Sequence, residues 1–215
     1  MSRWEATSFE ELDSIPVAEG LVWHPLRRRL GILAFGTNAY TAERVGDQVV
    51  EEHDETKGGG EPGGHEEMYV VVRGRATFTL DGETVEAPAG TIVFIRDPTV
   101  RRVAVAEDEG TLVLAVGGEA GRAYEASPWE WSFAAKPALR AGRWEEAIAT
   151  LEDGLAQRPG NPAILYNLAC AEAGAGRTAD ALAHLGEAVR ARPAYAELAR
   201  EDPDLASIRR EPGFP

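Results

Sequence analysis

Histidine and glutamate side chains are spaced for metal binding at two places in the first half of this 215-residue chain. His65 and Glu67 lie two residues apart, and Glu51 and His53 have the same spacing in the preceding run. Side chains two apart in an extended strand face the same side. Two imidazoles with one or two carboxylates could bind iron, manganese or zinc. In the alternative interpretation these residues bind no metal, because His53 lies in a solvated acidic run and His65 lies at a loop edge.

Short apolar segments separated by Gly, Pro and Asp must position these residues. They cover residues 30–35, 48–52, 68–72, 75–80, 91–95, 100–106 and 111–116. Many short strands at this spacing favour a sandwich or a barrel. Asp81 and Gly82 lie between two such runs and predict a tight antiparallel hairpin, because a two-residue turn needs positive φ. We therefore expect an antiparallel β-barrel between residues 20 and 118.

Two motifs in this region resemble those of the cupin family. Residues 67–74 contain a glutamate, an apolar strand and a closing glycine, similar to the first cupin motif. Residues 88–95 are similar to the turn and strand of the second motif, and the predicted hairpin lies between the two. The resemblance covers roughly residues 45 to 117 and implies a jelly-roll-like barrel.

The same resemblance implies a metal site that is incomplete in this chain. Cupin enzymes generally hold a divalent metal with two histidines and a glutamate from the first motif and one histidine from the second. Here Glu61 and Gly63 occupy the first two histidine positions, and Arg101 occupies the last. A guanidinium is a permanent cation without a lone pair, so Arg101 removes a ligand and adds repulsion. We therefore expect no metal or other cofactor.

The expected site is a polar pocket in which Glu67 is paired with Arg101. Tyr69 and Val103 follow these residues at a spacing of two, so they should project to the same interior. The pair could orient a small polar ligand by charge-assisted hydrogen bonds, or it could be structural. The alternative is a divalent metal site made of His53, His65 and Glu67.

The second half of the chain repeats itself with an offset of 34 residues. The offset aligns Gly142 with Gly176, Arg143 with Arg177, Ala147 with Ala181, Leu151 with Leu185, and Pro159 with Pro193. This segment resembles the tetratricopeptide repeat, in which two helices are joined by a tight turn and ended by a proline. The pattern predicts helices around 144–157, 162–174 and 178–191 and a short one after Asp202, with the helix before Gly142 truncated.

Charge and composition limit the classes of partner. The formal net charge of -14 repels phosphate backbones and anionic lipid, so we expect neither nucleic acid nor membrane as a partner. No apolar run is long enough to cross a bilayer and no leader follows Met1, which predicts a cytoplasmic protein. Cys170 is the only cysteine, and its apolar surroundings predict a buried side chain.

These patterns predict four parts of the chain. They are an N-terminal segment (1–19), a cupin-like barrel (20–125), a linker containing Trp129 and Trp131 (126–136), and tetratricopeptide-like repeats with a capping helix (137–215).

The two resemblances lead to two hypotheses about function. Tetratricopeptide-like repeats imply a surface that docks another protein, and a cupin-like sheet with an open edge favours a homodimer. We hypothesise a non-catalytic binding or regulatory protein, whose barrel is a small-ligand or dimerisation module. The alternative is a metal-dependent cupin enzyme of the isomerase, dioxygenase or decarboxylase type that uses a reassigned His/Glu site.

Overall fold

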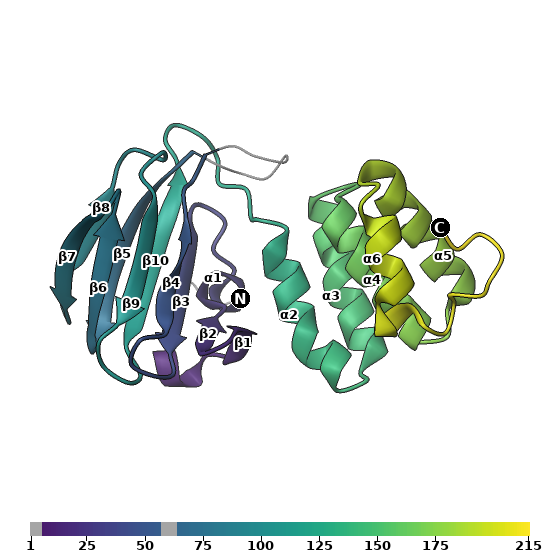
Figure 1. Cartoon of the computed structure of the whole chain (residues 1–215), viewed down its shortest axis with the longest axis horizontal. Helices are drawn as coiled ribbons and strands as arrows, with labels where there is room; N and C mark the ends of the chain where they lie inside the picture. The colour runs from purple at the N-terminus through teal and green to yellow at the C-terminus, as the bar shows by residue number, and fades with distance from the viewer. Residues whose placement is uncertain (1–5, 57–63) are drawn as a thin grey trace. The chain divides into compact units, whose positions relative to one another are not determined.

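The computed structural model describes residues 6–56 and 64–215 and divides the chain into two compact units (Figure 1). The sheet unit is Met1–Ser127, and the helical unit is Pro128–Pro215. Every strand among the described residues belongs to the sheet unit. Glu61 and Gly63, the motif positions at which the resemblance expects histidine, lie outside the described residues.

Two antiparallel sheets form the sheet unit. The first has the order β1 (Ile15–Ala18), β2 (Leu21–His24), β3 (Gly36–Ala42), β10 (Leu112–Glu119), β5 (His65–Arg73), β8 (Ile92–Ile95). The second has the order β4 (Gln48–His53), β9 (Arg102–Ala106), β6 (Arg75–Leu80), β7 (Glu83–Pro88). A short helix, α1 (Leu26–Leu30), connects β2 to β3. The antiparallel, cupin-like architecture is confirmed.

The predicted barrel is not closed. Each sheet keeps two edges, at β1 and β8 in one and at β4 and β7 in the other, so the strands form a sandwich. The first strand, β1, lies before residue 20, so the N-terminal segment contributes to the fold as well. A strand signal shows that a segment is extended but not which neighbour it pairs with, which is why the pattern could not separate a sandwich from a barrel.

The core of the sheet unit lies between the two sheets. Tyr69 and Val71 of β5 meet Phe78 of β6 and Ala104 of β9 in one buried cluster. The rings of Tyr69 and Phe78 are 5.7 Å apart between centroids. The predicted hairpin joins β6 to β7, with φ of 48° at Asp81 and 89° at Gly82. Local turn chemistry therefore sets the register of the strands that carry this core.

The helical unit contains α2 (Trp129–Arg140), α3 (Trp144–Gln157), α4 (Pro162–Gly174), α5 (Thr178–Ala191) and α6 (Tyr195–Glu201), followed by a 3₁₀ turn at Pro203–Leu205. The three helices predicted from the repeat are present with the predicted bounds. The predicted short helix after Asp202 is only the 3₁₀ turn, and α6 precedes it. No helix among the described residues is long and apolar enough to cross a bilayer.

The linker predicted for residues 126–136 lies mainly in α2, and the helix before Gly142 is not truncated. Packing holds this helix despite the proline at position 137, because Trp131, Ala135 and Ala138 are buried. The Trp131 ring lies against α3, where a Cβ on Gly154 would be 2.6 Å from its Cγ. The indole N–H donates to Asp153 at 2.8 Å. A glycine where the repeat usually has alanine therefore makes room for the tryptophan.

Candidate functional site

A polar cluster between the two sheets is built from strands of both. His53 ends β4 and is the cross-strand neighbour of Arg102, the first residue of β9. Glu67 and Tyr69 come from β5 of the other sheet and face the same interior, since they are two residues apart. Glu55 is the second residue after β4. The sandwich thus brings together residues that are distant in the sequence.

Glu67 is the centre of this cluster. Its Oε2 accepts a hydrogen bond from the Tyr69 hydroxyl. The same oxygen lies 3.8 Å from Nε2 of His53 and 3.6 Å from Nη1 of Arg102. One carboxylate therefore has a neutral donor and two basic groups around it.

A second carboxylate extends the cluster toward solvent. Glu55 places one oxygen 3.5 Å from Nε2 of His53 and the other 3.6 Å from Nδ1 of His65. Glu55 and His53 therefore connect His65 to Glu67 through a chain of charged contacts. Acidic and basic groups alternate along the cluster, which limits repulsion between like charges.

Burial increases from the histidine to the arginine. His53 is 35% exposed and Glu67 is 13% exposed. Arg102 is fully buried, and within the described residues none of its three guanidinium nitrogens has a hydrogen-bond partner. A buried cation is costly unless a counter-charge compensates it. The Glu67 carboxylate provides that counter-charge.

The pKa values of the cluster follow from these contacts. Burial lowers the pKa of His53, but the Glu55 and Glu67 carboxylates outweigh it and raise that pKa to about 10. Burial raises the pKa of Glu67, but His53 and Tyr69 outweigh it and the pKa falls below its usual range. Burial and the Glu67 charge raise the pKa of Tyr69 well above its usual value. Near neutral pH the cluster therefore contains an imidazolium, a carboxylate and a protonated phenol.

The predicted partner of Glu67 is wrong by one residue. Arg101 is 63% exposed and its Nε donates to Glu52 at 2.8 Å, on the solvent side. Its backbone N–H donates to the Asp81 side chain at 2.9 Å, so β9 begins at the next residue. Val103 faces the same side as Arg101 and is half-buried outside the predicted pocket. Because side chains alternate along a strand, a shift of one residue exchanges the two faces, and Arg102 takes the interior position.

The donor types for a divalent metal are present, but a buried cation opposes it. His53, Glu55 and Glu67 offer ligand atoms that all lie within 4.8 Å of one another. His65, which the alternative prediction included, is not part of this group. A metal on Glu67 would share its carboxylate with the guanidinium of Arg102, whose charge cannot be removed by deprotonation. Sequence reasoning missed Glu55 and Arg102, although Glu55 is two residues from His53 and Arg102 is adjacent to Arg101.

A second group of polar residues lies in the helical unit. The Tyr166 hydroxyl donates to Asp202 at 2.8 Å, and the Cys170 sulfur lies 3.9 Å from the same carboxylate. Cys170 is buried, as predicted. Burial and the nearby aspartates raise the pKa of its thiol, so the thiol stays protonated near neutral pH and is a poor nucleophile. This group connects α4 to the chain after α6.

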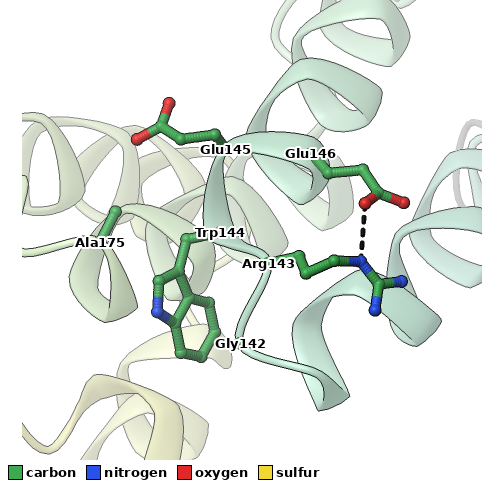
Figure 2. A pocket seen from close by; sticks show the side chains of 6 residues that line it. All are labelled: Gly142, Arg143, Trp144, Glu145, Glu146 and Ala175. Carbon is green, nitrogen blue, oxygen red and sulfur yellow. Dashed lines mark hydrogen bonds and ion pairs between the residues drawn. The ribbon is translucent and has the colours of Figure 1, made fainter.

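A shallow depression of about 450 Å³ lies at the turn between α2 and α3 (Figure 2). Its lining residues are Gly142, Arg143, Trp144, Glu145, Glu146 and Ala175. The Trp144 ring packs on α4, where a Cβ on Gly174 would lie 2.7 Å from it. Arg143 and Glu146 form an ion pair at 2.7 Å. The tryptophan thus fills a contact between helices.

Residues 138–201 match the family model of the tetratricopeptide repeat. The helical unit consists of tetratricopeptide-like repeats. This match confirms the repeat predicted from the 34-residue offset. The array pairs α2 with α3 and α4 with α5, and it continues into α6.

Solved structures similar to the chain include cupin proteins. KdgF from Halomonas sp. is 19% identical, with 52% of this chain and 93% of that chain covered and a TM-score of 0.39. A cupin protein from Bacteroides fragilis is 21% identical, with 59% of this chain and 92% of that chain covered and a TM-score of 0.40. A sugar phosphate isomerase of the cupin superfamily from Silicibacter pomeroyi is 15% identical, with 54% of this chain and 76% of that chain covered and a TM-score of 0.44. No curated protein sequence matches the chain. These scores are low, and the cupin-like architecture of the sheet unit rests on its two sheets and their strand order.

Proposed function

We propose that this chain is a non-catalytic binding protein, whose sheet unit binds a small polar ligand and whose tetratricopeptide-like repeats dock a segment of another protein. One observation carries the first part. The fully buried guanidinium of Arg102 lies 3.6 Å from the Glu67 carboxylate, at the position where a metal would need that carboxylate. A permanent cation there favours binding chemistry that needs no metal.

The cluster can bind a ligand through charge-assisted hydrogen bonds. Arg102 and His53 help to keep Glu67 ionised, so its partly exposed carboxylate can accept hydrogen bonds from a ligand hydroxyl or amide. The protonated imidazole of His53, which is partly exposed, can donate to an oxygen of the same ligand. A small molecule with both donors and acceptors fits this combination.

The remaining parts of the proposal come from the repeats and the charge. The helical hairpins support a docked protein segment, which is how repeat arrays of this type are built to bind. A homodimer through the open edge of a sheet in the sheet unit is a separate proposal. The cytoplasmic location and the exclusion of nucleic acid and membrane stay predictions.

The second candidate is a metal-dependent enzyme of the isomerase, dioxygenase or decarboxylase type. The group of His53, Glu55 and Glu67 favours it, since three ligand atoms within 4.8 Å could hold a divalent cation. The Arg102 guanidinium disfavours it for the reason given above.

Native mass spectrometry and elemental analysis of the same tag-free sample distinguish the two candidates. We expect a co-purified organic molecule on the wild-type chain, lost in His53→Gln and retained in Glu52→Gln. Glu52 is a matched control because it lies next to His53 on β4 but pairs with Arg101 in solvent. Stoichiometric iron, manganese or zinc that is lost in His53→Gln would contradict the proposal and favour the enzyme. A chain with no bound molecule would contradict the ligand-binding part.

A further inference from the structure

The two carboxylate oxygens of Glu67 are used unequally. Oε2 accepts from the Tyr69 hydroxyl and lies near the basic nitrogens of His53 and Arg102. Among the residues that the structure describes, none forms a hydrogen bond or an ion pair with Oε1. An ionised carboxylate can accept at both oxygens. Since the Glu67 side chain is 13% exposed, Oε1 is an acceptor that another molecule can use.

Solvent reaches the inner face of the larger sheet at this point. Gly117 of β10 is the cross-strand neighbour of Glu67, so both face the space between the sheets. His65 lies two residues before Glu67 on β5 and faces the same way. All three are half-buried, whereas Tyr69 and Val71, farther along β5, are buried. We call the partly exposed inner surface of His65, Glu67 and Gly117 the open end of the sandwich.

The glycine on β10 positions the Glu67 side chain. A Cβ on Gly117 would lie 3.0 Å from Cγ of Glu67 and 3.5 Å from its Oε1. The lack of a side chain therefore lets Glu67 lie against β10. Glycine weakens a strand, and within one it often marks such a close approach. The position of the unused acceptor thus depends on a residue of the neighbouring strand.

An aromatic wall borders the open end. Gly36 of β3 pairs with Gly117, and a Cβ on Gly36 would lie 2.7 Å from the Tyr124 ring. The ring can therefore pack directly on the backbone of β3. Its centroid is 6.2 Å from that of the His65 ring. Binding sites for small molecules commonly combine aromatic walls with a few polar groups that fix orientation, and at the open end Glu67 is such a group.

The charges near the open end favour an uncharged ligand. The positive charges of His53 and Arg102 lie against the carboxylates of Glu55 and Glu67, so the cluster compensates its own charges. A bound anion would add negative charge beside Glu67, on a chain whose net charge is -14. A bound cation would meet His53 and the permanent charge of Arg102. A partly buried charge without a counter-charge is costly, whereas a neutral O–H or N–H can donate to Oε1 without changing the balance.

We propose that the open end binds an uncharged small molecule whose hydroxyl or amide N–H donates to Oε1 of Glu67 and whose apolar side packs on Tyr124 and His65. Gly117 is a positioning residue for this contact. The inference rests on the proposed ligand-binding function of the sheet unit and narrows the ligand to an uncharged class, in place of organic acids, phosphates and amines.

Lactamide and lactate are matched probes, because both carry a hydroxyl and a methyl group but only lactate is charged near neutral pH. Saturation-transfer NMR with the tag-free full chain measures the binding of each. We expect lactate to bind at least about tenfold more weakly than lactamide, because its charge is repelled by Glu67.

Gly117→Ala should weaken lactamide binding by about tenfold or more, since its Cβ displaces Glu67 and removes a hydrogen bond to a charged group. Gly118→Ala is the matched control, because Gly118 is the next residue, faces outward, and a Cβ on it would meet no described atom within 4 Å. It should leave lactamide binding unchanged. Circular dichroism that matches the wild-type chain establishes that lost binding is not lost folding. If Gly117→Ala does not fold, Tyr124→Leu replaces it and should weaken lactamide binding by removing the aromatic wall.

Three results would overturn the inference, and they are distinct from a failure of the proposed function. Lactate that binds as tightly as lactamide, or a co-purified molecule that is an organic acid, a phosphate or an amine, would refute the uncharged class while ligand binding by the sheet unit stands. Lactamide binding that a folded Gly117→Ala retains would show that Oε1 of Glu67 is not the acceptor. If neither probe binds, the inference fails, and native mass spectrometry decides whether the ligand-binding function fails as well.

Discussion

Replacing Glu67 with glutamine should destabilise the sheet unit more than replacing Arg102 with methionine, although both changes break the same ion pair. The Arg102 guanidinium is fully buried, has no hydrogen-bond partner among the residues that the structure describes, and lies within ion-pair distance of the Glu67 carboxylate. Glu67 is less dependent on the pair, because it is partly exposed, accepts from Tyr69 and lies near His53. The two charges are therefore unequally compensated when the other is removed.

The magnitudes follow from this asymmetry. Leaving one partner of a buried ion pair uncompensated costs about 3–5 kcal/mol of unfolding free energy, and Glu67→Gln should fall in this range. Arg102→Met leaves a carboxylate with two other partners, so we expect a loss of about 1–2 kcal/mol, between the values for exposed and buried pairs. The double variant should regain most of what Glu67→Gln loses, because it no longer buries a cation.

Hydrogen exchange of the full chain measures these effects in the sheet unit alone. Peptides from β5 and β6 report the opening free energy of the sheets, separately from the helical unit. Arg101→Met is the matched control, since this neighbouring arginine is exposed and pairs with Glu52 at the surface. It should change stability by no more than about 0.5 kcal/mol.

Two outcomes would refute this reasoning. If Glu67→Gln is as mild as Arg101→Met, the buried guanidinium does not need the carboxylate. If the losses of the two single variants simply add in the double variant, the two charges do not compensate each other. A large loss in Arg101→Met would restore the predicted pair of Glu67 with that residue.

Three further changes test other parts of the structure. Folding raises the pKa of His53 to about 10 from an unfolded value of about 6.5, so its charge stabilises the sheet unit fully below pH 6.5, and this contribution is lost as the pH rises toward 10. Urea midpoints should therefore fall across that window, and less so in His53→Gln; equal slopes would contradict the raised pKa. Gly154→Ala should lower the stability of the helical unit by about 1–3 kcal/mol in thermal melts, because its Cβ would meet Trp131. Gly186→Ala, in a helix where the nearest side-chain atom is 3.5 Å away, should raise it by about 0.4–1 kcal/mol. Ala181→Leu should cost about 1–3 kcal/mol in urea unfolding, since Ala181 is fully buried where α4 meets α5, and an unchanged midpoint would show that this contact is loose.

Local signals in the sequence determined the features that depend on a few consecutive residues. The turn at Asp81 and Gly82 needs positive φ, and both residues have it. Gly142 and Gly176 lie in the turns of the two repeats with φ of 68° and 76°, in the register that the 34-residue offset predicts. Helical periodicity between such turns was enough to place α3, α4 and α5, because each signal lies within the element that it describes.

The composition of the candidate site depended on contacts that no local signal contains. The motif alignment located Glu67 and Tyr69 on one face of β5, but the pairing of β9 with β4 and β6, which starts at Arg102, decides which arginine faces inward. That start turns Arg102 inward, and a period of two residues makes an error of one position an exchange of faces.

Tertiary contacts likewise determine that the predicted linker is helical and that the predicted barrel is an open sandwich. Prolines within residues 126–136 and just beyond weaken the helical signal of this segment. The burial of Trp131 against Gly154 stabilises α2 despite them. The pairing partners of β4 and β8, which leave both strands at sheet edges, come from long-range contacts as well. Propensity and turn chemistry act over a few residues, whereas strand pairing and helix packing are chosen by the free energy of the whole core, so only the folded chain shows which side chains share the site.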